Sequence, residues 1–441
     1  MIGFAKDYVL TFIWLLTNLI YFVNPSHPGG QFGLLLGLYV TQFGLLYFIY
    51  KNKKQSLLLL FVVGIIARLI LIPTSPIFED DFYRYQWDGR VIVNSVNPYE
   101  YPPNSPELDS IHTDYREKIG FLHLRTIYPP LAEHIFAFNA LVFNESLAGL
   151  KFIFLIFDLL IAFILYRWLQ MRAKDPKILV FYLLNPMVLK EIANSAHLDP
   201  IMVFFFVASA FYLDKSLFKK LPSIEWKSWT LLALSILSKL IPIIFLPYFL
   251  KLGRRRWVGL VLFSLVLLGV SLPYINTPYF MNGLQPFSKY WVFNEFLFFP
   301  LSWLSNGLLS LLELDATPTM KSAMINEIPG KFLGALVLGI VYLYRWIKIQ
   351  STDSLARDFM WITFLLLSVS PVFNTWYGLW FLPFAIITHQ WALIALTGLS
   401  ALSYSWYWDK SLYPYLQLLE YSLFLVLWFW MYKKSIFKKS G

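Results

Sequence analysis

Long apolar runs divide this 441-residue chain and restrict what it can fold into. Residues 8–23, 33–50, 152–169 and 259–272 are long enough, or nearly so, to cross about 30 Å of hydrocarbon as helices. The runs are continuous and not alternating, which argues against strands. Because 58% of the residues are hydrophobic, an ordinary soluble domain is also excluded. The sequence therefore predicts an all-α polytopic membrane protein.

The net charge of +10 is gathered in short basic clusters between the apolar runs. The positive-inside rule assigns these clusters to the cytoplasmic side. Since they mark loops and do not form one basic surface, nucleic acid is not an expected partner. The clusters are Lys51, Lys53 and Lys54; Arg167, Arg172, Lys174 and Lys177; Lys215, Lys219 and Lys220; Lys251 and Arg254–Arg256; Arg345, Lys348 and Arg357; and Lys433, Lys434, Lys438 and Lys439.

This charge assignment predicts about 14 crossings in one integral membrane domain, residues 1–441, with both termini cytoplasmic. Two long segments, 74–148 and 275–330, then face outward, and residues 290–312 are expected to form an interfacial helix. The expected spans are 8–24, 31–50, 56–73, 149–168, 178–193, 199–213, 228–239, 241–251, 257–274, 331–348, 358–370, 376–389, 391–405 and 415–432.

Three pairs of these spans are too short for full crossings and flank polar residues. The polar junctions are residues 194–199, Lys239 and residues 370–377, and the charge map turns all three outward. Irregular backbone at membrane depth is tolerated where it lines a cavity. The sequence therefore predicts a cavity on the outer side. Arg68 and Asp158, each inside a span, are expected to be structural ion partners or ends that reach the interface.

Three adjacent carboxylates, Glu79, Asp80 and Asp81, follow directly on an apolar run in a chain with 14% charged residues. Carboxylates gathered at a membrane surface can activate a hydroxyl or hold a cation. If the segment is helical, the three acids occupy its first turn, and Arg84 shares a face with Asp81 and Asp88. The alternative is a capped, solvated juxtamembrane helix. Interleaved aromatics favour sugar or headgroup binding, but they also suit an interfacial belt.

Polar groups at the junctions carry further candidate chemistry. His197 and Asp199 can ligate a metal or bind a substrate, or can satisfy each other locally. Lys239 lies between apolar stretches, where a lysine costs at least about 2.5 kcal/mol. It therefore needs an anion such as a lipid phosphate, or it extends to the interface. Tyr128 precedes two prolines and an apolar stretch, residues 131–143, that is expected to be a re-entrant or surface helix.

The segment from Glu79 to Tyr99, followed by Thr126-Ile127-Tyr128-Pro129-Pro130-Leu131-Ala132, resembles the first outer loop of GT-C superfamily glycosyltransferases. The resemblance is closest to the bacterial, mannosyltransferase-like branch that uses polyprenyl phosphate sugars. The eukaryotic enzyme that adds the first mannose of the GPI anchor has a similar plan. Over residues 56–390 later motifs agree in order: Leu184-Asn185-Pro186, Ser238-Lys239-Leu240-Ile241-Pro242, Trp291-Val292-Phe293-Asn294 and Ser370-Pro371.

The resemblance implies an inverting glycosyltransferase that moves a sugar, mannose by analogy, from a polyprenyl phosphate to a lipid or glycan acceptor. It implies Asp81 as catalytic base with Asp80 as its support. Glu79 stands where the related motif has aspartate, so a divalent cation (Mg²⁺ or Mn²⁺) held by Glu79 and Asp81 stays open. The expected substrate contacts are Glu79, Tyr83, Arg84, Trp87, Asp88, Arg90, Tyr128, His197, Asp199, Lys239, Trp376 and Tyr377.

The expected location is the bacterial inner (plasma) membrane, with the active site on its outer face and membrane lipids as neighbours. A transporter or flippase of a lipid-linked sugar precursor is the alternative, because broken spans and a midplane lysine suit it too. A non-catalytic assembly subunit is the third hypothesis. The concentration of acids in one outer loop favours the enzyme.

Overall fold

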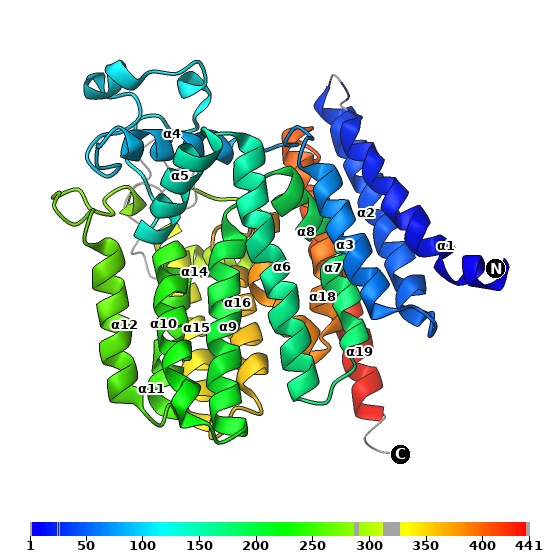
Figure 1. Ribbon diagram of the computed structural model, residues 1–441. Coiled ribbons are helices and arrows are strands. Elements are labelled where there is room, and N and C mark those ends of the chain that lie inside the picture. The colour runs from blue at the N-terminus through cyan, green and yellow to red at the C-terminus, as the bar shows by residue number, and fades with distance from the viewer. Residues whose placement is uncertain (1, 24, 26, 286–290, 312–326, 438–441) are drawn as a thin grey trace.

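Apolar helices lying side by side make up the body of the protein in the computed structural model (Figure 1). The structure describes residues 2–23, 25, 27–285, 291–311 and 327–437. Within these ranges it contains helices and no strand, only an isolated bridge between Phe293 and Val372. The prediction of an all-α polytopic membrane protein is confirmed.

The α-helices fall where the apolar runs fall. Four helical stretches are long and apolar enough to cross a membrane by length and composition, namely α2, α6, α9 and Ile328–Lys348 of α15. The bounds are α1 (Ile2–Thr17), α2 (Pro28–Lys51), α3 (Leu57–Leu71), α4 (Asp81–Val93), α5 (Pro130–Phe143), α6 (Leu147–Met171), α7 (Val180–Leu183), α8 (Pro186–Val188), α9 (Asp199–Phe218), α10 (Glu225–Ser238), α11 (Leu246–Leu252), α12 (Arg256–Ser271), α14 (Phe298–Leu311), α15 (Glu327–Lys348), α16 (Leu355–Ser368), α17 (Gly378–Thr388), α18 (Trp391–Leu399) and α19 (Tyr413–Phe437).

Of the two expected half-spans that flank residues 194–199, the first is interrupted and the second is a continuous helix. The expected span 178–193 consists of the short helices α7 and α8 and a π-helical turn, Leu189–Asn194. The expected half-span 199–213 is wrong, since α9 continues to Phe218. Asp214, which suggested an earlier end, is neutralised inside the fold. Its carboxylate accepts hydrogen bonds from Trp168 Nε1 (2.6 Å) and Arg172 Nε (2.9 Å).

The first outer segment lies across one end of the bundle, with α4 and α5 packed against each other (Figure 1). It contacts the second outer segment directly: Asn97 Nδ2 donates to Asn276 Oδ1 at 2.8 Å, and the Arg125 guanidinium lies 3.9 Å from the Tyr279 ring centroid. The α11 helix and the end of α19 lie at the opposite end (Figure 1). The two segments that the charge map turns outward are thus neighbours.

The helix expected over residues 290–312 is represented by α14, and residues 290 and 312 lie outside the described part. This helix packs against α15, a contact that the expectation of an interfacial helix did not include. The α5 helix forms as expected, with Pro130 at its first position, where the missing N–H removes no bond.

A buried ion pair ties the first apolar helices together. Arg68 Nε donates to Asp158, and Arg68 Nη1 donates to the Leu183 carbonyl at 2.6 Å. The Tyr182 hydroxyl adds a 2.7 Å bond to the same carboxylate. These contacts join α3, α6 and α7, and they confirm the structural role expected for Arg68 and Asp158.

Candidate active site

Asn194 fixes the chain that leads into the acidic segment. Its side-chain oxygen accepts from the Ile77 N–H at 3.0 Å, and its Nδ2 donates to Thr74 Oγ1 (2.9 Å) and to the Ser75 carbonyl (2.7 Å). Asn194 closes the π-helical turn, a rare geometry that often occurs at functional sites. The broken span and the acidic segment are therefore held together by one fully buried amide.

Glu79 is packed against that turn in a group of four ionisable side chains. Its Oε2 lies 3.3 Å from His197 Nε2, and the other ring nitrogen of His197 lies 3.0 Å from Glu191 Oε2. The Lys190 ammonium lies 3.6 Å from Glu79 and 3.2 Å from Glu191. Burial alone would lower the pKa of His197, but the charges of Glu79 and Glu191 raise it to about 10. The group thus balances two anions with two cations.

A second group surrounds Asp199 at the start of α9. Asp199 Oδ1 accepts from the Lys239 ammonium at 2.8 Å and from Trp380 Nε1 at 2.5 Å. The same ammonium lies 4.6 Å from the Tyr377 ring centroid and 4.7 Å from that of Trp380. About a quarter of the Lys239 side chain remains exposed, so its contacts do not enclose it completely. Its environment is an anion and two aromatic faces.

The Trp376 ring joins the two groups. It stacks on His197 with 3.9 Å between the ring centroids, and the next residue, Tyr377, stacks on Trp380 at 4.1 Å. The polar junctions around residues 194–199, Lys239 and 370–377 therefore converge, as the sequence predicted, although they arise from separate parts of the chain.

Asp81 is half-buried at the first position of α4. Burial raises the pKa of its carboxyl to about 6; the charges of His197 and Lys239 oppose this rise, while those of Glu79 and Asp80 add to it. Asp80 is exposed as the N-cap residue. Because α4 begins at Asp81, Glu79 and Asp80 precede the helix, and the expectation of three acids in its first turn is wrong.

Tyr128 also lies near the Asp81 carboxylate. Burial raises the pKa of the Tyr128 hydroxyl, and the charge of Asp81 is the next largest cause. The Tyr128 ring packs edge-on against Phe136 of α5 and against Tyr85 of α4. Five expected site residues are thus gathered around Asp81: Glu79, Tyr128, His197, Lys239 and, through Lys239, Asp199.

Other expected contacts from α4 have internal partners instead. Arg84 Nε donates to both oxygens of Asp88 (2.8 and 2.9 Å), and within the described residues Arg84 forms no ion pair with Asp81, the other acid of the expected face. Trp87 is 1% exposed, beneath the guanidinium of Arg116 at 5.3 Å. A buried indole and a buried ion pair stabilise the outer segment, and a role of Arg84, Trp87 or Asp88 in substrate binding stays a prediction.

Two further residues of α4 also face its own segment. Tyr83 stacks on Tyr115 with 6.1 Å between ring centroids. Arg90 Nε donates to Glu145 Oε2 at 3.0 Å, which ties α4 to the connection between α5 and α6. These contacts tie both side chains to the outer segment, and their role in substrate binding stays a prediction.

The residues that sequence reasoning missed are Lys190, Glu191, Asn194 and Trp380. A usable signal was present for the first two, since adjacent charges interrupt an apolar half-span. Trp380 carried no such signal, because one more aromatic in an apolar helix indicates packing.

Among the described residues, one group of possible metal ligands lies within 4.8 Å of one another, and it is Glu79, Glu191 and His197. Asp81, expected as a ligand beside Glu79, is not part of it. The two ring nitrogens of His197 lie close to different carboxylates, so the imidazole already pairs with both acids. The Lys190 ammonium already supplies positive charge to both acids. The group therefore fits an internal ion cluster better than a metal site.

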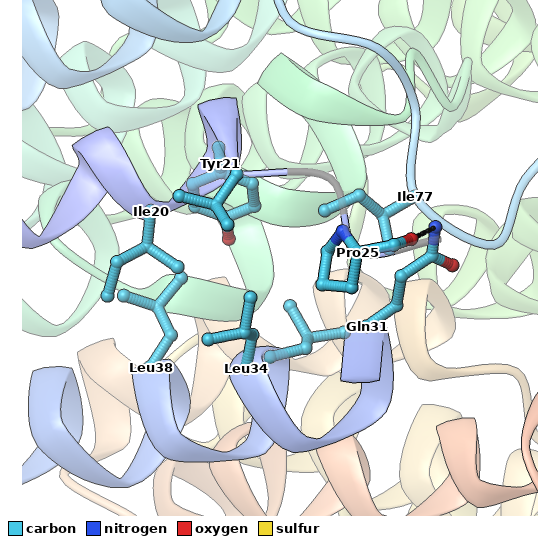
Figure 2. A pocket seen from close by; sticks show the side chains of 9 residues that line it. Ile20, Tyr21, Pro25, Gln31, Leu34, Leu38 and Ile77 are labelled. Atoms are coloured by element: carbon cyan, nitrogen blue, oxygen red, sulfur yellow. Dashed lines mark hydrogen bonds between the residues drawn. The ribbon is translucent and has the colours of Figure 1, made fainter. Parts of the chain in front are cut away.

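A small cavity adjoins the acidic segment between η1 (Asn18–Phe22), α2 and Ile77 (Figure 2). Its volume of about 10 Å³ is close to the space of one water molecule. The Tyr21 hydroxyl, buried and without a hydrogen-bond partner, is directed into it (Figure 2). This cavity is too small for a sugar, so it is not the outer cavity that the sequence predicted.

A model of the family described as alpha-(1->6)-mannopyranosyltransferase, N-terminal domain, matches residues 38–253. This range includes α4, α5 and the charged residues of the Glu79 and Asp199 groups, but not the aromatic residues of 376–380. No curated protein and no solved structure matches the chain. The fold and the match together define a membrane-embedded glycosyltransferase. More particularly, the chain is similar over residues 38–253 to this mannosyltransferase family, which agrees with the sugar transfer that the resemblance of its acidic segment implied.

Proposed function

We propose that this enzyme transfers mannose from a polyprenyl phosphate to a lipid or glycan acceptor, with Asp81 as the catalytic base. The observation that carries the proposal is the position of Asp81. Its carboxylate is half-buried at the start of α4, and the charges of His197 and Lys239 act on it. The family match supports mannose as the transferred sugar.

The proposed step is a single displacement. The acceptor hydroxyl oxygen attacks C1 of the mannosyl group while Asp81 accepts its proton. The bond between C1 and the phosphate oxygen breaks, and polyprenyl phosphate leaves with the bonding electrons. Such a step inverts the anomeric centre. The name of the matched family describes an alpha linkage, so inversion requires a beta-linked donor.

Lys239 supports departure of the phosphate. Its partly exposed ammonium is held by Asp199 and by two aromatic faces, and a fixed cation stabilises charge that develops on a leaving oxygen. Asp80, exposed next to the base in sequence, is proposed to support the base and to contact the acceptor. Trp376 and Tyr377, each stacked on one side, are proposed to line the sugar site.

The outer membrane face is the proposed site of transfer. The outer segments and the group around Asp81 lie at the end opposite α11 and the basic residues that follow it (Figure 1). Basic loops stay on the cytoplasmic side. A polyprenyl phosphate sugar is a suitable donor there because its lipid keeps it in the membrane.

The test is transfer of radiolabelled mannose from a beta-linked polyprenyl phosphate to membrane lipid by the purified full-length protein. We expect Asp81→Asn to lose about 10²- to 10⁴-fold of the rate, since an amide cannot accept the proton. Asp114→Asn, an exposed acid of the same outer segment, is the matched control and keeps full activity. Full turnover by Asp81→Asn contradicts the assignment of the base. Donor movement across the membrane without transfer supports the flippase instead.

A further inference from the structure

A second cavity, of about 320 Å³, opens between α11, α12 and α15. Its lining consists of Pro247, Leu250, Lys251, Arg256 and Trp346. It lies at the α11 end of the bundle, away from the acidic segment (Figure 1). The cavity is therefore lined by two cations, one indole and two apolar side chains.

Lys251 is held in place at this cavity. Its ammonium donates to the carbonyls of Trp346 (2.5 Å) and Ile347 (3.0 Å) at the C-terminal end of α15, and it lies 4.8 Å from the Trp346 ring centroid. An ammonium has three donors, so one is left over. The bound lysine thus presents a charge of fixed position.

Arg256 adds a second charge that no carboxylate neutralises. It opens α12, is exposed, and within the described ranges forms no ion pair, only a contact with the Trp257 ring at 5.7 Å. The nearby acids are already engaged. Glu225 accepts the main-chain N–H groups of Arg254 and Arg255, and Asp358 pairs with Arg345 at 2.7 Å. The cavity is therefore complementary to an anion.

The helices on either side of the cavity present apolar faces to the surroundings. On α12 the exposed side chains are Trp257, Val258, Val261, Leu265 and Leu268, and on α15 they are Ile340, Leu343, Tyr344 and Ile347. In a bilayer these faces contact acyl chains. An anion bound in the cavity therefore lies next to the lipid-facing surfaces of α12 and α15. Trp346 then lies at the membrane–water boundary, where tryptophan is enriched.

We propose that this cavity binds the phosphate of an anionic phospholipid, with its acyl chains along α12 and α15. The site is separate from the sugar-transfer chemistry and does not depend on it. The polyprenyl donor is not the occupant, because its proposed site is at the other end of the molecule.

The experiment is native mass spectrometry of the purified full-length protein after incubation with phosphatidylglycerol, phosphatidylcholine or inorganic phosphate, each in a separate arm. We expect one phosphatidylglycerol molecule to be retained in preference to the other two. Arg256→Gln is expected to lower its retention about fivefold. Leu250→Trp, which fills the cavity and keeps both charges, is expected to lower it as well.

Arg255→Gln is the matched control, since it removes the same charge one residue away and outside the lining. Retention that falls equally in Arg255→Gln and Arg256→Gln would mean diffuse attraction to a basic loop and would overturn the proposal. So would unchanged retention in Leu250→Trp, or binding of inorganic phosphate as strong as that of the lipid. Both variants change exposed or half-buried side chains, so the fold is expected to survive.

Discussion

At the scale of single residues, the surroundings of Asp81 set the pH range in which it can act. Its pKa of about 6 results first from burial, which the neighbouring cations only partly oppose. A general base is active when ionised, so the rate falls as the pH decreases through about 6 and levels off above it. We expect kcat/KM for mannose transfer, measured between about pH 5 and 8, to lose about tenfold per unit below this value. A flat profile down to about pH 5 would contradict this role.

The ion cluster of Glu79, Glu191, His197 and Lys190 makes a prediction about metal. Two carboxylates in a buried site need positive charge nearby, and Lys190 with His197 supplies it. We therefore expect the purified enzyme to keep most of its transfer activity in excess EDTA. Lys190→Gln, which leaves one charge unbalanced, is expected to lose both stability and activity. Loss of wild-type activity in EDTA with recovery on addition of Mg²⁺ or Mn²⁺ would show that the cluster holds an ion.

At the scale of elements, α4 owes its position to buried contacts of its own segment. The Arg84–Asp88 pair has side chains only 10% and 3% exposed. We expect Asp88→Asn to lower the free energy of unfolding by about 3–5 kcal/mol, because it leaves a buried guanidinium without its partner. The measurement is the thermal unfolding midpoint of the purified proteins in one detergent. Glu145→Gln, at the more exposed pair with Arg90, is the comparison and is expected to cost about 1 kcal/mol or less. Equal shifts would count against the buried pair as the anchor of α4.

Several elements were predictable because charge interrupts an apolar run. The junctions at 194–199, Lys239 and 370–377 were found in this way, and so was the first outer segment. The pairing of Lys190 with Glu191 was not, since adjacent residues on a regular helix do not face each other and the π-helical turn is not visible in composition. The burial of Trp87 was not predictable for a similar reason. The outer segment has a small core of its own, formed by Trp87, Val91, Leu108 and Ile119. From sequence alone, the aromatic and apolar residues of such a core cannot be distinguished from those of a binding surface.

At the scale of the whole molecule, the sequence predicted a helical bundle with two outward segments because membrane insertion leaves a strong pattern of charge and hydropathy. It did not predict which side chains of distant segments contact one another. The contacts of Asn97 with Asn276 and of Arg125 with Tyr279 join loops that are far apart in the chain, and no periodicity encodes such pairs. Their effect is that the acidic segment and both polar groups form one end of the protein.

That arrangement makes the sidedness directly testable, because the chain contains no cysteine. Ser110 lies in the first outer segment and Ser223 lies between α9 and α10, and both are exposed. We expect Ser110→Cys to react with a membrane-impermeant maleimide on intact cells, and Ser223→Cys to react only after permeabilisation. The wild-type protein is the blank for both. Retained transfer activity shows that each variant is folded. Since basic loops remain inside, labelling of Ser223→Cys in intact cells would invert the topology and place Asp81 on the cytoplasmic face.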